Sequence, residues 1–273
     1  MTFPASRSRP GRAVHGDSSR AIRRALPEEV PVAVVCDGTT QAVMMASPGD
    51  IEDFASGFAL SEGIVTALDQ IESSEIVEHE TGIEARMWLR EDRGARLGAR
   101  RRFMAGPVGC GLCGIDSLEE ATRPLPHLGT DGPVFSHADV ARSTDGLRDC
   151  QPLHDLTHAT HAAGFLRPGE GIVLAREDVG RHNALDKLIG AMARQGIDPR
   201  EGAFVMTSRL SVELVQKCAM AHCPVLIAAS APTAHALRLA EEAGITVAAF
   251  VRDGRFDLYA HPFRIAPEVS DVA

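Results

Sequence analysis

The chain has 273 residues, 44% of them hydrophobic and 24% charged, which is ordinary for a globular protein and long enough for one large or two moderate domains. Its formal net charge of −9 argues against a general binder of nucleic acid or anionic membranes. No apolar run approaches the roughly 20 residues of a membrane span. We therefore expect neither nucleic-acid nor membrane partners.

The N-terminal residues 1–25 hold six arginines among serine, proline and glycine, and they lack the apolar segment of a secretory signal. This composition predicts a disordered tail over residues 1–25. The chain has six cysteines but only one closely spaced pair, which fits free thiols in a reducing cytoplasm.

Residues 26–124 are expected to form a small α+β domain. Asp37-Gly38 lies between two apolar runs and predicts a β-hairpin, and Ser47-Pro48-Gly49-Asp50 predicts a helix start with Ser47 as its cap. The expected strands lie at 30–35, 41–46, 71–77 and 83–89.

Residues 125–273 are expected to form an α/β domain. After a helix capped by Ser136, short apolar runs alternate with helical patterns, and such runs are typical of a sheet buried on both faces in a three-layer arrangement. The expected strands are 172–175, 204–207, 225–229 and 245–250, and the expected helices are 136–148, 184–193, 212–221 and 233–243.

Polar loops follow each of the four expected strands. Ligands of such sheets bind beyond the carboxyl ends of the strands, where helix N-termini and arginine side chains suit phosphates. The loops are 177–183, 208–211, 230–233 and 252–255, so we expect a nucleotide-like ligand there, although helix capping would explain their serines and threonine equally well.

Three histidines, His154, His158 and His161, are spaced as on one helix face. They could bind a metal, but no acidic residue completes a recognised zinc motif. We expect no metal here and place His161 in the lining of a cleft.

Cys110 and Cys113 lie between glycines in the sequence Gly-Cys-Gly-Leu-Cys-Gly. Asp116 and Glu119 predict a helix start beside them, and a helix N-terminus favours the thiolate. Half of a zinc site, a redox pair, a sulfur relay through a persulfide and two unreactive cysteines all remain open. The arginine-rich segment 86–102 could hold a phosphorylated ligand or an acidic partner, or could be a solvated basic edge.

The chain resembles the formate dehydrogenase accessory proteins of the FdhD type from about residue 30 to residue 263. The run Asp178 to Lys187 carries the most specific likeness. The other matching stretches are Cys110 to Gly114, Thr160 to Ala163, Ser208-Arg209 with Glu213 and Lys217, Ser230 to Thr233, and Phe250 to Arg255.

The resemblance implies a cytoplasmic sulfurtransferase, usually a homodimer, with a cytidine-deaminase-like C-terminal fold. Such proteins accept sulfur as a persulfide from a cysteine desulfurase and pass it to the molybdenum or tungsten bis(molybdopterin guanine dinucleotide) cofactor that serves formate dehydrogenase. The sequence does not indicate whether the metal is molybdenum or tungsten, or which formate dehydrogenase receives the cofactor.

By position in this family, Cys110 would carry the persulfide and Cys113 would be its partner. The Arg181-His182 and Ser208-Arg209 loops would add cofactor contacts. The segment credited with holding the cofactor corresponds to Phe250, Val251, Arg252, Asp253, Gly254 and Arg255.

The chain departs from the family at Gly106-Pro107-Val108-Gly109, where relatives often have serine or threonine. Deaminase activity is not expected, because zinc deaminases need an H-x-E motif, which the chain lacks. The rival to a sulfurtransferase is a non-catalytic chaperone that binds and delivers the cofactor.

Overall fold

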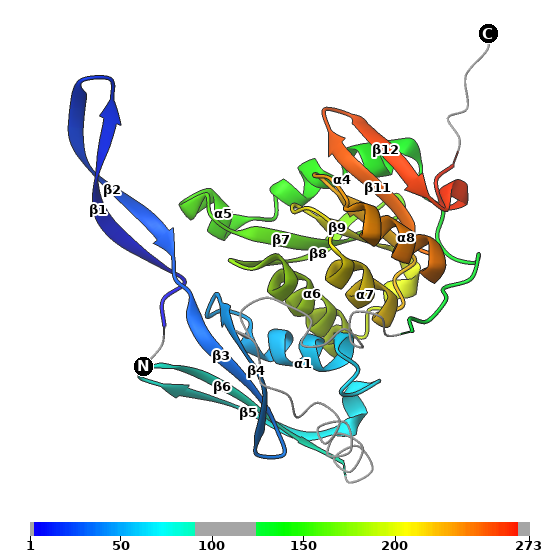
Figure 1. The fold of residues 1–273 in the computed structure, drawn as a ribbon, viewed down its shortest axis with the longest axis horizontal. Coiled ribbons are helices and arrows are strands. Elements are labelled where there is room, and N and C mark those ends of the chain that lie inside the picture. The colour runs from blue at the N-terminus through cyan, green and yellow to red at the C-terminus, as the bar shows by residue number, and fades with distance from the viewer. Residues whose placement is uncertain (1–2, 91–123, 267–273) are drawn as a thin grey trace.

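The structure is a computed structural model, and it describes residues 3–90 and 124–266. The described strands form three sheets, of two, four and six strands (Figure 1). We call the four-stranded sheet with helix α1, Ile51–Ser61, the N-terminal unit, and the six-stranded sheet with its helices the C-terminal unit. The two units meet where α1 lies against α6, Arg181–Gln195, of the C-terminal unit.

The four-stranded sheet has the order β4-β3-β6-β5, with β3 and β6 parallel and the other pairs antiparallel. Asp37 and Gly38 form its first turn with φ of 48° and 72°, as a two-residue hairpin loop with two left-handed positions requires. Helix α1, Ile51–Ser61, packs its apolar side on the sheet. The strands are β3 Val30–Cys36, β4 Thr39–Ala46, β5 Ile71–His79 and β6 Gly82–Leu89, and the short 3-10 helix Leu68–Gln70 precedes β5.

The six-stranded sheet has the order β12-β11-β10-β9-β7-β8. Strands β9, β10 and β11 are parallel, β7 runs antiparallel to both β9 and β8, and β12 runs antiparallel to β11. Strand β8 therefore points the same way as β9, β10 and β11. The strands are β7 His161–Arg167, β8 Gly171–Asp178, β9 Ala203–Met206, β10 Val225–Ala228, β11 Thr246–Arg252 and β12 Arg255–Ala260.

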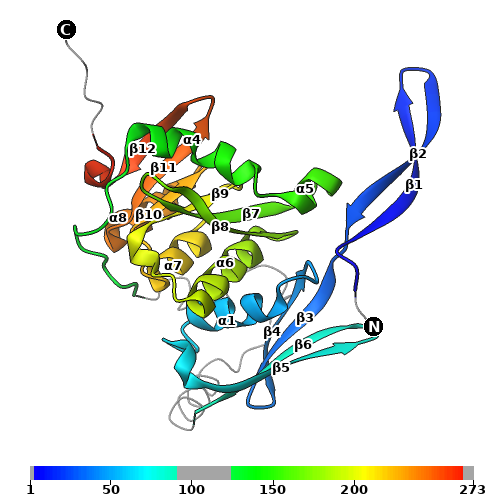
Figure 2. The same ribbon diagram turned by 180° about the vertical axis from the view of Figure 1, so that it is seen from behind.

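Helices cover both faces of this sheet. Helices α6, Arg181–Gln195, α7, Val212–Met220, and α8, Ala234–Ala243, bury one face, and α4, His137–Arg148, buries the other (Figures 1 and 2). The sequence-based prediction of helices on both faces is confirmed, and the likeness to cytidine deaminases stays a prediction. Helix α5, Pro152–Thr157, and the 3-10 helices Pro199–Glu201 and Pro262–Arg264 complete the described elements.

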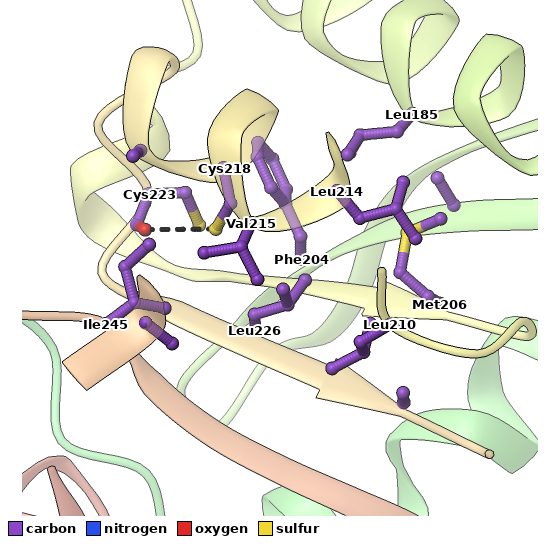
Figure 3. Close-up of a cluster of buried hydrophobic side chains, with 14 of the residues drawn as sticks. Leu185, Phe204, Met206, Leu210, Leu214, Val215, Cys218, Cys223, Leu226 and Ile245 are labelled. Atoms are coloured by element: carbon purple, nitrogen blue, oxygen red, sulfur yellow. Dashed lines mark hydrogen bonds between the residues drawn. The ribbon is translucent and has the colours of Figure 1, made fainter. Parts of the chain in front are cut away.

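Two of the cysteines belong to the core beneath α7. Cys218 and Cys223 are fully buried among Phe204, Leu226 and Ile245, and the Cys218 thiol donates to the Cys223 carbonyl at 3.2 Å (Figure 3). Burial raises the pKa of the Cys218 thiol well above its usual value, with the Cys223 contact adding to the effect. These thiols are structural.

The prediction of a disordered tail over residues 1–25 is wrong. Strands β1, Ser6–His15, and β2, Ser18–Pro27, pair in continuous register and project from the body as a two-stranded hairpin (Figures 1 and 2). Composition argued only that the segment could not form a core. The Gly16-Asp17 turn, with Gly16 at φ 57°, still allows the two strands to pair. The backbone hydrogen bonds of this pairing do not require a hydrophobic core.

Two local predictions also need correction. Ser47 is not the cap of α1, because Asp50 occupies that position. His154, His158 and His161 do not share a helix, because α5 ends at Thr157, His158 is left-handed and His161 begins β7. The sequence reading also missed β7 and β12, whose short mixed patterns lack clear period-2 alternation.

Candidate functional site at the carboxyl ends of the strands

The predicted polar loops do meet at one edge of the large sheet. Because β8, β9, β10 and β11 point the same way, their carboxyl ends lie together, and the antiparallel β7 begins at the same edge. His161 at that start pairs in register with Asp178 at the end of β8, and its Nδ1 lies 3.5 Å from the Thr207 hydroxyl. We call this region the strand-end edge.

Two helices begin at the strand-end edge without a side-chain cap. The N-cap residues are Gly180 for α6 and Ser211 for α7, and neither makes a side-chain capping bond within the described residues. Helix α8 differs, because the Thr233 hydroxyl accepts from Ala236 N–H at 3.2 Å. Uncapped N–H groups and the positive helix end favour an anion, and Arg181 and the exposed Arg209 add fixed positive charge.

His182 links the first turns of α6 and α7. Its Nε2 lies 3.4 Å from the Ser211 hydroxyl and 3.9 Å from the Glu213 carboxylate. Burial, with the charges of Arg181 and Lys217 acting in the same direction, lowers the pKa of His182 to about 4. At neutral pH the ring is therefore uncharged, and one nitrogen can donate while the other accepts.

The pKa of His161 is also lowered. Burial lowers its pKa, and the charges of Arg181 and His154 act in the same direction. The strand-end edge thus carries two neutral imidazoles beside an arginine, which suits hydrogen bonding to a phosphate or a nucleobase without a second full charge.

Most of the run from Asp178 to Lys187 supports the fold instead of facing a ligand. Asp178 is fully buried, pairs with Lys187 at 2.7 Å and accepts from Ser47 N–H at 2.9 Å, Gly180 N–H at 2.8 Å and the Asn183 amide at 3.0 Å. The Lys187 ammonium in turn donates to the Ser47 carbonyl at 2.9 Å. This ion pair ties the loop before α1 to α6, so it joins the two units.

A second buried ion pair joins the two units at the other end of α1. Lys217 lies 3.0 Å from Asp186 and 2.6 Å from Glu62, and the Ser61 hydroxyl donates to Asp186 at 2.6 Å. Burial raises the pKa of Asp186 to about 6 against the opposing pull of Lys217 and Ser61. Ser47 and Ser61 are the contributors that sequence reasoning missed, because isolated serines carry no signal of a partner more than 100 positions away.

The segment Phe250 to Arg255 divides between core and solvent. The Val251 side chain is buried and its carbonyl accepts from the Thr144 hydroxyl at 3.1 Å, so it packs in the core. Phe250 holds a left-handed φ of 54°, donates its N–H to the Ser230 carbonyl at 3.3 Å and is partly exposed beside Tyr259. Asp253 and Gly254 form the turn between β11 and β12, Arg252 and Arg255 flank it in the two strands, and all four residues are exposed.

Cys110 and Cys113 lie outside the described residues, as do Arg93 to Arg102 and the helix start predicted at Asp116. Of the cysteines that the structure describes, Cys36, Cys218 and Cys223 are buried and Cys150 is exposed. Within residues 3–90 and 124–266, no three potential metal ligands lie together. In the same ranges, no helix is long and apolar enough to cross a membrane.

Two cavities lie away from the strand-end edge. One, of about 360 Å³, opens between the start of α1 and strands β5 and β6, and it is lined by Asp50, Glu52, Asp53, Glu78 and Arg194 among others. The other, of about 310 Å³, lies beside His127, Arg200 and His222. Neither of these two cavities includes a residue of the predicted site.

The fold and this edge define a mixed α/β protein with a surface suited to an anionic ligand. Residues 27–266 match the FdhD/NarQ family, and the chain belongs to that family. The chain is 57% identical over 242 residues to the "Sulfur carrier protein FdhD" of Brucella abortus, covering 89% of this chain and 90% of the relative.

Two further comparisons agree. The protein of that name from Cupriavidus necator is 47% identical over 270 residues, which cover 98% of this chain and 91% of the relative. A crystal structure of a candidate formate dehydrogenase accessory protein from Desulfotalea psychrophila superposes with a TM-score of 0.77 at 23% identity, covering 96% of this chain and all of that one. At this identity the superposition shows the shared fold.

Proposed function

We propose that this protein is a cytoplasmic sulfurtransferase, acting as a homodimer, that carries sulfur on Cys110 from a cysteine desulfurase to the bis(molybdopterin guanine dinucleotide) cofactor of formate dehydrogenase. Three things support the proposal: membership of the FdhD/NarQ family, the name of the relatives as sulfur carriers, and the cysteine pair itself.

The observation that carries the proposal is the strand-end edge. Uncapped N-termini of α6 and α7 meet Arg181, Arg209 and two neutral imidazoles there, and this set can bind the phosphates and the guanine of a dinucleotide. Phe250 offers a partly exposed ring near the carboxyl end of β11. The metal-bearing cofactor is the substrate that these groups would hold.

The thiol chemistry begins with the Cys110 thiolate. It attacks the outer sulfur of the desulfurase persulfide, forms a new S–S bond and releases the donor cysteine as a thiolate. The Cys113 thiolate can then attack the inner sulfur of the Cys110 persulfide. That step forms a Cys110–Cys113 disulfide and expels sulfide toward the metal, and a dithiol reductant resets the pair.

The test follows ³⁵S from a cysteine desulfurase onto the protein. Because Cys150 is exposed and could accept sulfur adventitiously, the work uses a Cys150→Ser background. We expect label and a mass gain of one sulfur atom on Cys110, lost in Cys110→Ala together with formate dehydrogenase activation. A Cys110→Ala protein that still carries label and still activates formate dehydrogenase would refute the assignment.

The same experiment separates the chaperone alternative. If the double variant Cys110→Ala/Cys113→Ala supports formate dehydrogenase at normal levels, the protein delivers the cofactor without thiol chemistry. Retained guanine-nucleotide binding by that variant would show that its strand-end edge is intact.

A further inference from the structure

The hairpin of β1 and β2 is an arm without a core. No residue of either strand is buried, although the strands pair along their whole length. An isolated two-stranded hairpin is marginally stable in water, and both of its outer edges present unpaired backbone groups. In the described part of the chain, β2 lies beside α5 near the base of the arm, and Arg7 pairs with Glu28. Such an arm needs a partner.

The arm is strongly basic, whereas the rest of the chain is acidic. Residues 6–27 hold six arginines and one aspartate, a net charge of +5. Since the whole chain carries −9, the remainder carries −14. The arm and the body of this protein therefore attract each other when they belong to different copies.

The register of the hairpin gathers arginines on one face. Arg9 lies directly opposite Arg24, and Arg7 and Arg20 share that face with Ile22. Like charges at directly opposed positions destabilise a ladder. The arrangement is unfavourable for the arm alone and becomes favourable when carboxylates lie against this face.

The matching acidic surface is edge strand β5 with the turn that follows it. Residues 69–84 contain six acidic side chains and neither lysine nor arginine. Strand β5 ends the four-stranded sheet, so among the residues that the structure describes one side of its backbone has no neighbouring strand. Glu72 and Glu75 are exposed on the strand and Glu80 in the turn after it, and Arg86 of β6 lies 3.7 Å from Glu75. At about 3.3 Å per residue, β5 and the arm are also of similar length, roughly 30 Å.

We propose that the arm of one chain docks on β5 of a second copy, and that the second arm docks reciprocally in a two-fold dimer. In both views of the molecule the arm points away from its own β5, so the contact is made between copies (Figures 1 and 2). A reciprocal contact closes the assembly at two subunits. This inference gives a surface to the proposed homodimer and is independent of sulfur transfer.

A charge-swap experiment on the full chain tests the docking. Variant A is Arg9→Glu/Arg24→Glu, and variant B is Glu72→Arg/Glu80→Arg; all four positions are exposed. Sedimentation velocity should show a wild-type dimer whose association weakens as salt rises above about 0.1 M. Each variant alone should dimerise at least tenfold more weakly, because its two substituted side chains then face groups of their own sign. An equimolar mixture of A and B should regain the dimer, since both contacts are complementary again.

The control for variant A is Arg142→Glu/Arg238→Glu, which changes the net charge by the same amount as variant A but at exposed positions of α4 and α8. It should dimerise like the wild type. The proposal is overturned by a monomeric wild type, by variant A dimerising normally, by a mixture that stays monomeric, or by a control as weak as variant A. Association that nuclease treatment abolishes would assign the arm to nucleic acid and also overturn it. Circular dichroism checks that every variant is folded.

Discussion

Gly57 of α1 and Gly190 of α6 bring the two helices into backbone contact. A Cβ atom added at Gly57 would lie 1.7 Å from the Asp186 carbonyl oxygen, and one at Gly190 would lie 1.9 Å from the Asp53 carbonyl oxygen. Arg176 and Arg194 flank the crossing with ion pairs to Asp53 at 2.8 and 2.6 Å. The two units are therefore held as one body at a point where only glycine fits.

We expect Gly57→Ala and Gly190→Ala each to lower the free energy of unfolding by about 3 kcal/mol or more, because the clash is with backbone and the helices must separate. Urea denaturation measures the loss. Gly49→Ala is the matched control, since a Cβ there meets nothing within 4 Å. Equal stability of Gly57→Ala and Gly49→Ala would show that the helices are not in contact.

Lys187→Met should lower the free energy of unfolding by roughly 3–5 kcal/mol, because it leaves the buried Asp178 carboxylate without its counter-ion. The double variant Asp178→Asn/Lys187→Met should recover part of that loss, which a double-mutant cycle in urea quantifies. If Lys187→Met is as stable as the wild type, the residue is no structural counter-ion and a direct role with ligand becomes the better explanation.

His182 should make stability depend on pH between about 4 and 6.5. Its folded pKa of about 4 lies below the ordinary value of 6.5, so the unfolded chain binds a proton first and stability falls as pH falls through this range. The contribution lost between pH 7 and pH 5 is about 2 kcal/mol. His182→Gln should lack it, so the stability difference between variant and wild type should shift in favour of the variant at pH 5.

Asp186 acts in the opposite direction over the same range. Its folded pKa of about 6 lies above the ordinary 3.8, so its contribution is fully present below pH 3.8 and is lost as pH rises to about 6. The His182→Gln protein should therefore become less stable from pH 4 to pH 6 on account of Asp186. Thermal melts across this range check the slope, and a rising stability would contradict it.

Arg181→Gln and Arg209→Gln should each weaken binding of a guanine nucleotide by about tenfold, the effect of one charge-assisted contact to phosphate. Isothermal titration with GDP measures the affinity. Arg142→Gln, an exposed change on α4, should bind like the wild type. Unchanged affinity in both loop variants would remove the strand-end edge as the phosphate site.

Thiol reactivity should follow burial. In the native protein a maleimide should label Cys150 but not Cys36, Cys218 or Cys223, which are buried and become reactive only on unfolding. Peptide mass spectrometry with and without denaturant measures this. Rapid native labelling of Cys218 would mean that the core under α7 opens readily.

Much of the fold was predictable from local patterns. The turn at Asp37-Gly38, the cap at Ser136 and the alternation of buried runs with amphipathic helices from β8 onward were all confirmed, because each depends on residues within a few positions of one another. The convergence of the strand-end loops was also confirmed, since it follows from strands that point the same way. The histidine spacing failed because a left-handed His158 ends the helix, which spacing cannot reveal.

The sequence by itself determined the family, the cysteine pair and the polar loops, because these are contiguous motifs whose chemistry resides in the residues themselves. Only the tertiary structure decided which of those residues are available to a ligand. It places Asp178, Asp186, Lys187 and Lys217 in buried ion pairs that bind Ser47, Ser61 and Glu62 of the N-terminal unit, and leaves Arg181 and Arg209 at the edge. The reason is physical: a charge can be buried only where distant segments supply its counter-ion and hydrogen bonds, and those partners are set by the packing of α1 on α6.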